Sequence, residues 1–232
     1  MSGSIKVWDA PLRLFHGLFA LSVSGAIATG WLGGNLMIWH GRLGLLVFGL
    51  LVFRLLWGVC GSTYARWSRI VSAPLRLPAY LRGEWHHAGH NPLGSLSVLA
   101  LLGLVGFQVA SGLVANDDIA FQGPLHRLVD SDTSAWLTGL HREAKWWLLG
   151  LIGLHVLAIA YYSLIRKRPL VRAMITGRSQ RTSAEQHDAQ GGAPWLAAMT
   201  LVCAMLAVWA VDSAAGWLAP PPPKAAPVML DW

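Results

Sequence analysis

Four histidines lie in or beside long apolar stretches of this 232-residue chain: His16, His40, His141 and His155. The last two are 14 residues apart, which on one α-helix is about 40° short of four full turns and a rise of about 21 Å. Both side chains would therefore face one side of that helix at two depths. Imidazole is a common axial ligand of haem iron, and the core of a helical bundle is a common cofactor site.

The direction of successive helices sorts these histidines into two layers. Helices that cross a membrane in alternating directions would place His16 beside His155 on one side, and His40 beside His141 on the other. A lone histidine in an apolar helix is more often a hydrogen-bonded core residue than a ligand. Two matched layers favour two bis-histidine haem sites instead, because ionisable groups at membrane depth are costly and commonly functional.

The elements that would carry these residues are membrane-spanning helices. Hydrophobic residues make up 54% of the chain and charged residues only 12%, against about 25% charged in soluble domains. A span needs about 20 apolar residues. The sequence therefore predicts an all-α integral membrane helical bundle, with a four-helix di-haem core and a fifth C-terminal transmembrane helix. The predicted spans cover residues 12–32, 38–59, 92–115, 145–165 and 195–218.

Loop charges predict the orientation of the bundle. Basic residues gather in the N-terminus, the 60–91 loop and the 166–194 stretch, so the positive-inside rule predicts a cytoplasmic N-terminus and a periplasmic C-terminus. No cleavable signal peptide is predicted. Because the positive charge lies in loops between spans, the net charge of +7 does not indicate a nucleic-acid partner. The predicted segments are a four-helix domain over 1–177, a flexible cytoplasmic linker over 178–194, and a fifth helix with a periplasmic proline-rich tail over 195–232.

Basic side chains near the histidines are candidate partners for anionic haem propionates. Arg13 lies about one helical turn before His16, and the other candidates lie near the predicted periplasmic pair. Each is equally interpretable as an interface anchor. These other candidates are Arg42, Arg142 and Lys145.

The remaining histidines and the cysteines are interpreted more simply. His126 is an alternative ligand for the periplasmic haem. The group His86, His87 and His90 is compact enough for zinc, but a plain interfacial loop is the favoured interpretation, and His187 is predicted to be exposed. Neither Cys60 nor Cys203 belongs to a CxxCH motif, which excludes covalently attached c-type haem.

Several motifs resemble those of bacterial cytochrome b561 and of the b-type cytochrome subunit of nickel–iron hydrogenases. They are VWDAPLRLFH at 7–16, WHGRLG at 39–44, GHNPLG at 89–94, GLH at 139–141 and LH at 154–155. The resemblance covers about residues 5–177. It implies a bacterial inner-membrane protein with two haems b, whose axial ligands are His16, His40, His141 and His155.

The resemblance further implies electron transfer, with no catalytic side chain singled out and no quinone site identified. The leading hypothesis is transfer between the membrane quinone pool and a periplasmic redox partner, with a c-type cytochrome as the first choice. The alternatives are a subunit of a hydrogenase or other dehydrogenase, a superoxide:quinone oxidoreductase, and a haem-free membrane anchor.

The 116–142 loop is the predicted docking surface for that partner. It combines apolar residues, spaced as in a short helix lying on the membrane, with four aspartates that include Asp117 and Asp118. Acidic residues there would steer a basic partner toward the periplasmic haem. The alternative is that the loop only caps the bundle.

Overall fold

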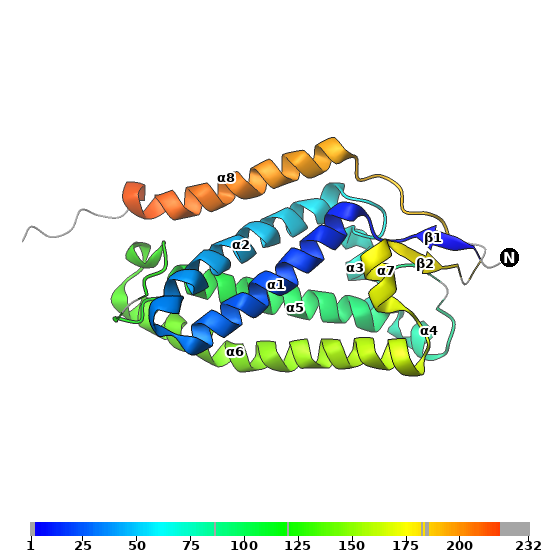
Figure 1. The fold of residues 1–232 in the computed structure, drawn as a ribbon, viewed down its shortest axis with the longest axis horizontal. Helices are drawn as coiled ribbons and strands as arrows, with labels where there is room; N and C mark the ends of the chain where they lie inside the picture. The colour runs from blue at the N-terminus through cyan, green and yellow to red at the C-terminus, as the bar shows by residue number, and fades with distance from the viewer. Residues whose placement is uncertain (1–2, 86, 120, 182, 184–185, 219–232) are drawn as a thin grey trace, which may run out of the picture.

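The computed structural model describes residues 3–85, 87–119, 121–181, 183 and 186–218. Within this part of the chain, five helices are long and apolar enough to cross a membrane, which confirms the predicted all-α membrane bundle (Figure 1). His86 and the proline-rich tail lie outside the described residues. The five helices are α1 (Ala10–Leu32), α2 (Met37–Cys60), α5 (Pro92–Leu113), α6 (Ser131–Ala160) and α8 (Pro194–Leu218).

Three of these helices begin at side-chain caps. Asp9, Asn91 and Asp130 each accept a hydrogen bond from the backbone N–H three residues further on, at 2.7 to 2.8 Å. Such a cap satisfies one of the N–H groups that the first turn of a helix leaves without a partner. Proline stands in the first turn of α1 and α5, where its missing N–H costs nothing.

Helix α6 begins 14 residues before the predicted span. The prediction placed the start at 145, whereas the structure places it at Ser131, because Asp130 caps a polar first turn that a count of apolar residues does not detect. The earlier start puts His141 and His155 on one helix. At its other end α6 runs into a π-helical turn, Tyr161–Ile165.

Helices α1, α2, α5 and α6 form the four-helix unit, and α8 packs along the outside of α2 (Figure 1). The contact of α8 with α2 is close, since a Cβ added at Gly49 would lie 2.8 Å from Val208 Cγ2. The middle of the four-helix unit is filled by a cluster of buried apolar side chains. Its members are Val23, Val47, Leu51, Val105 and Leu148.

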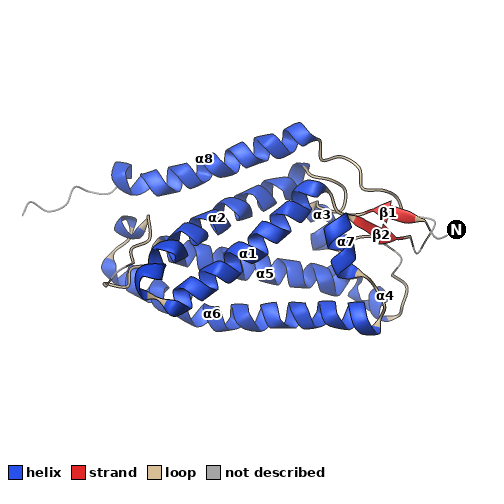
Figure 2. Ribbon diagram, viewed as in Figure 1, coloured by secondary structure: helices blue, strands red, loops and turns tan. Residues whose placement is uncertain are grey.

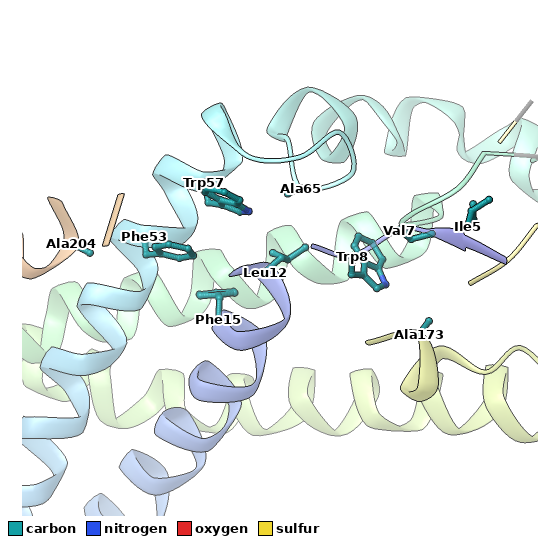
Figure 3. Packing of buried hydrophobic residues seen from close by; sticks show 10 residues of the cluster. All are labelled: Ile5, Val7, Trp8, Leu12, Phe15, Phe53, Trp57, Ala65, Ala173 and Ala204. Carbon is teal, nitrogen blue, oxygen red and sulfur yellow. The ribbon is translucent and has the colours of Figure 1, made fainter. Parts of the chain in front are cut away.

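The end of the bundle that holds the start of α1 is here called the N-terminal end. Figure 2 shows that the two short strands lie there, and a second cluster packs beneath them around Trp8 and Trp57 (Figure 3). The short elements are the strands β1 (Ser4–Lys6) and β2 (Arg178–Gln180), the helices α3 (Trp67–Ser72), α4 (Leu77–Leu81) and α7 (Leu170–Thr176), and the 3-10 turn η2 (Pro74–Arg76).

The predicted flexible linker over 178–194 is instead packed against the domain where the structure describes it. Strand β2 pairs antiparallel with β1, with Ile5 opposite Ser179. Further along, the backbone of Gln190 exchanges hydrogen bonds with Thr63. The segment is polar because it lies at the surface, and its backbone hydrogen bonds hold it there. The side chain of His187 is exposed, as predicted.

The opposite end of the bundle, here called the far end, holds the connections from α1 to α2 and from α5 to α6. The first contains the turn η1 (Gly34–Leu36) and the second the turn η3 (His126–Leu128). The prediction of a short surface helix within 116–142 is wrong. Asn116 bridges to Gln122 in a tight loop, and residues 131–142 belong to α6.

Candidate cofactor sites between the helices

The histidines of α2 and α6 meet at the far end. The rings of His40 and His141 have centroids 6.0 Å apart, with an angle of 86° between their planes. A metal–imidazole bond is about 2 Å long, so this separation matches that of two rings that share one metal atom. The layer that the sequence predicted is therefore present as a pair of facing rings, and ligation itself stays a prediction.

Hydrogen bonds hold both rings by the same nitrogen. His40 Nδ1 lies 2.8 Å from the carbonyl oxygen of Ala26, and His141 Nδ1 lies 3.0 Å from that of Gln108 and 3.1 Å from Ser111 Oγ. A carbonyl accepts only, so Nδ1 carries the hydrogen and Nε2 keeps its lone pair. Metal-binding histidines commonly have this arrangement, in which one ring nitrogen is anchored and the other is free to coordinate.

A cavity of about 790 Å³ opens beside these two rings, within the roughly 300–1,000 Å³ usual for cofactor pockets. Small residues leave it room. A Cβ at Gly30 would lie 2.7 Å from His40 Nδ1, and one at Gly112 would lie 3.2 Å from His141 Cε1. The size of the cavity and the donor set of two imidazoles fit a haem at this end.

Three of the four predicted propionate partners line this cavity: Arg42, Arg142 and Lys145. Arg42 also stacks on Trp39, and Lys145 lies 5.0 Å from the ring centroid of Trp31. These cations therefore border the cavity, and two of them also contact tryptophan rings. Both roles that the sequence left open, propionate partner and interface anchor, are compatible with these positions.

The fourth predicted partner, Arg13, lies at the N-terminal end. Its Nη1 donates a hydrogen bond to the carbonyl oxygen of Ile175, at the end of α7. Arg13 Nε is buried without a hydrogen-bond partner. The guanidinium thus fastens α7 to the start of α1.

The second histidine pair also lies at the N-terminal end. His16 and His155 interact electrostatically, and His155 Nδ1 lies 3.2 Å from Ser97 Oγ. The ring of His155 is therefore anchored through Nδ1, as both far-end rings are. Nδ1 is thus the hydrogen-bonded ring nitrogen in three of the four histidines, as is common in metal-binding histidines.

On each of the four helices, residues spaced by seven positions form three successive layers from the far end to the N-terminal end. Seven residues are close to two helical turns, about 10.5 Å along the axis, so residues spaced by seven share a face. The middle layer is the apolar cluster described above. From the far end the layers are Gly30, His40, Gly112 and His141, then Val23, Val47, Val105 and Leu148, then His16, Arg54, Val98 and His155.

Two polar residues at the N-terminal end are not among the sequence-based candidates for a haem site: Arg54, and His90, which the sequence places only in a possible zinc group. Arg54 is only 3% exposed. His90 packs on Trp8, with ring centroids 4.6 Å apart. Burial first, and the charge of Arg54 next, lower the pKa of His90 to about 4, so its ring is neutral at pH 7. The one sequence signal for Arg54 was its position 14 residues after His40, the spacing that also separates the two histidines of α6.

The other histidines lie apart from the paired rings. His126 Nδ1 lies 2.8 Å from the carbonyl oxygen of Gly123, and His126 is not among the residues that line the far-end cavity. His87 Nε2 lies 3.1 Å from Arg76 Nη1. The structure thus brings the rings of His40 and His141 together, places His16 and His155 at the opposite end of the bundle, and leaves His126 outside the cavity lining.

Comparison with known proteins agrees with this geometry. Residues 7–177 match the family model of prokaryotic cytochrome b561. Proteins named "Probable Ni/Fe-hydrogenase B-type cytochrome subunit" from Azotobacter chroococcum mcd 1 and Azotobacter vinelandii are each 22% identical over 216 residues, covering 75% of this chain and 88% of the relative. The protein of that name from Bradyrhizobium diazoefficiens is 22% identical over 218 residues, covering 76% and 86%. No solved structure gives a significant match.

The matched region runs from the buried stretch before α1 to the end of α7, and it contains all four paired histidines. Helix α8 lies beyond it. Family, fold and membrane spans all indicate a multi-pass b-type cytochrome that transfers electrons. This chain belongs to the prokaryotic cytochrome b561 family.

Proposed function

We propose that this protein is a di-haem cytochrome b that passes electrons across the bacterial inner membrane, between the quinone pool and a periplasmic redox partner. The observation that carries the proposal is the pair of histidine layers, one at each end of the four-helix unit. In this proposal the axial ligands of one haem are His40 and His141, and those of the other are His16 and His155.

Haem b, when bound, supplies a one-electron iron couple. The side chains of the protein hold and insulate it. Two imidazoles from different helices would hold each haem, and the chemistry supplied there would be outer-sphere electron transfer. The carbonyl oxygens of Ala26 and Gln108 hold two of the rings by Nδ1. The apolar middle layer keeps the two sites about 21 Å apart along α6 and excludes water between them.

Charge supports a cytoplasmic N-terminal end. The segments at that end carry most of the basic residues of the chain, including the exposed side chains Arg166, Lys167 and Arg168. The positive-inside rule then places the far end, with the cavity beside His40 and His141, on the periplasmic side. A soluble partner would meet the haem there.

A c-type cytochrome is the first candidate for that partner, and a hydrogenase is the second. The second is supported by the names of the curated relatives, which are hydrogenase cytochrome subunits. At 22% identity, that resemblance supports the electron-transfer role more strongly than it supports one partner. The electron path through the bundle is the same for both.

The test is electron transfer by the purified, haem-loaded protein in liposomes. A quinol should reduce both haems, and an added periplasmic c-type cytochrome should reoxidise them. Reoxidation by that cytochrome supports the first partner, while reduction of the haems by a hydrogenase and H₂ supports the second. If quinol leaves the haems oxidised at every concentration, exchange with the quinone pool is wrong.

A further inference from the structure

The N-terminal layer contains a buried cation, Arg54, in addition to the two proposed haem ligands. Arg54, in α2, is 3% exposed, and its Nη1 is buried without a hydrogen-bond partner. Its guanidinium stacks on Trp67, with Cζ 4.3 Å from the ring centroid. Stacking satisfies the face of the guanidinium but not its N–H groups. A buried charged donor without an acceptor is costly, so this position favours an acceptor from outside the chain.

The nearest carboxylate does not serve as that acceptor. Asp9 interacts electrostatically with Arg54, but its oxygens accept hydrogen bonds from Leu12 N, Trp57 Nε1 and Ser62 Oγ. Among the described residues, no ion pair within 4.0 Å includes Arg54. Asp9 lowers the cost of burying the positive charge and leaves the Nη1 hydrogens available.

The position of Arg54 along α2 directs it into the bundle. It follows His40 by 14 residues, so the two lie on nearly the same face of the helix, about 21 Å apart. That face also carries Val47 and Leu51, which pack in the central core. Arg54 therefore lies in α2 at the depth of His16 and His155, where the other layer has a histidine ligand.

A second buried nitrogen belongs to the same group. His90 Nδ1 has no hydrogen-bond partner and is buried. His90 interacts electrostatically with Arg54, His16 and His155, so it lies among the cation and the two proposed ligands. Two buried nitrogens without partners, one from α2 and one from the segment before α5, thus lie near the same histidine pair.

We propose that Arg54, assisted by His90, binds a propionate carboxylate of the haem held by His16 and His155. The inference rests on the proposed function, because it requires a haem in this layer. A guanidinium matches a carboxylate in shape and charge and forms strong, charge-assisted hydrogen bonds with it. Arg13, the candidate from sequence, uses Nη1 to hold Ile175, and its Nε is a second buried donor without a partner at this end. Arg54 is favoured over Arg13 because it lies on the face of α2 that packs in the bundle core, at the depth of His16 and His155. A phospholipid phosphate offers similar anionic oxygens and is the competing source.

The experiment uses the haem-loaded protein and its Arg54→Leu, Arg54→Gln and Arg54→Lys variants. Resonance Raman spectra report the propionate bending modes, and a spectroelectrochemical titration reports the midpoint potential of each haem. The haem of the N-terminal layer is identified as the one lost in His16→Ala. Arg172→Gln is the matched control, because it removes the same charge from an exposed position on α7 at the same end.

Arg54→Leu and Arg54→Gln should shift the propionate bending mode of that haem and lower its midpoint potential, because loss of a nearby positive charge favours the ferric state. Arg54→Lys should keep the potential close to wild type while still shifting the bending mode, since lysine keeps the charge but not the planar fork. The other haem, and Arg172→Gln, should be unchanged in both measurements.

Unchanged bending modes and potentials in Arg54→Gln would overturn the inference. If that result comes with fewer phospholipids retained per protein, Nη1 binds a lipid phosphate. Should Arg54→Leu fail to fold, Arg54→Gln and Arg54→Lys still decide, because both keep a polar side chain at this position. Absence of haem in the wild-type protein would instead contradict the proposed function, so the two failures are distinguishable.

Discussion

The ring of His40 is confined on two sides by the backbone of α1. The carbonyl oxygen of Ala26 accepts its Nδ1 hydrogen at 2.8 Å, and the missing side chain at Gly30 makes room for the ring. A Cβ at position 30 would lie 2.7 Å from Nδ1, closer than real Cβ contacts. Glycine is therefore needed at this position because of the ring and not because of its backbone conformation.

Gly30→Ala should displace the His40 ring and weaken or abolish the absorbance of the far-end haem, while the other haem stays intact. Gly103→Ala is the matched control, since nothing lies within 4 Å of its added Cβ. Alanine raises helix propensity by about 1 kcal/mol over glycine, so propensity alone would stabilise both variants. Reduced-minus-oxidised spectra measure the effect. A wild-type spectrum for Gly30→Ala would show that the ring is not held by this contact.

Single substitutions of the four histidines should fall into two spectral classes. His16→Ala and His155→Ala should each disturb one haem, and His40→Ala and His141→Ala the other, because each iron loses one of its two axial ligands. Low-temperature difference spectra of the four variants provide the measurement. Any other grouping, or a loss of the far-end haem in His126→Ala with none in His40→Ala, would contradict the pairing.

Spacing within the sequence was enough to predict the four histidines as pairs. Spacing does not identify Arg54 or His90 as candidate cofactor-binding residues. What distinguishes them is a buried nitrogen without a hydrogen-bond partner, and this depends on the tertiary structure. The hydrogen bonds from Nδ1 of His40 and His141 to Ala26 and Gln108 could not be predicted either, since both acceptors are backbone carbonyls that the sequence does not distinguish.

At the scale of elements, helices that are apolar throughout are predictable to within a few residues, because the length of the apolar run defines them. The start of α6 was not, since its first turns are polar. The strands β1 and β2 have three residues each, too few for an alternating pattern to be detected. Because the pairing of β1 with β2 is not evident from the sequence, the polar stretch around Gln190 is predicted to be a linker. In the structure, hydrogen bonds fix it to Thr63.

Helix α8 packs on α2 outside the four-helix unit and contributes one residue, Asp212, to the lining of the far-end cavity. The four paired histidines all lie in the other helices, so haem binding should not depend on α8. A chain that ends after Gly192 keeps β2 and the contacts of Gln190, and should retain both haems with unchanged spectra. Pigment content per polypeptide after purification is the measurement. Loss of either haem from this chain would make α8 part of the cofactor sites.

A chain that ends earlier, after Gly177, shows whether residues 178–192 contribute to stability, to haem binding or to both. It removes β2 and exposes the edge of β1, so it should have a lower thermal stability than the chain that ends after Gly192. The difference is expected in the unfolding temperature and not in the number of haems. Equal unfolding temperatures would show that the packing of 178–192 adds no stability.

At the scale of the whole molecule, the acidic far-end loop is the proposed approach for a basic partner. Asp117 Oδ1 accepts hydrogen bonds from the backbone of Ile119 and Phe121, and Asp118 has a φ of 57°. Asparagine can make the same acceptor contacts and tolerates that conformation. Replacing both aspartates with asparagine therefore removes charge with little change in the loop.

The double variant Asp117→Asn, Asp118→Asn should transfer electrons to a c-type cytochrome more slowly than wild type at low salt. The two rates should converge at high salt, because screening removes steering. Stopped-flow oxidation of the reduced protein across ionic strengths measures both rates. Equal rates at every salt concentration would exclude these acids from docking.

The central proposal is that one chain holds two haems, one at each end of the four-helix unit, and that each haem lies between two histidines from different helices at that end. The most direct test is the haem content of the purified protein by the pyridine haemochrome assay, combined with electron paramagnetic resonance of the oxidised form. The account predicts about two haems b per polypeptide, a count that follows from two pairs of axial ligands, and low-spin signals only. One haem per chain, no haem, or a high-spin signal at stoichiometric intensity would contradict it.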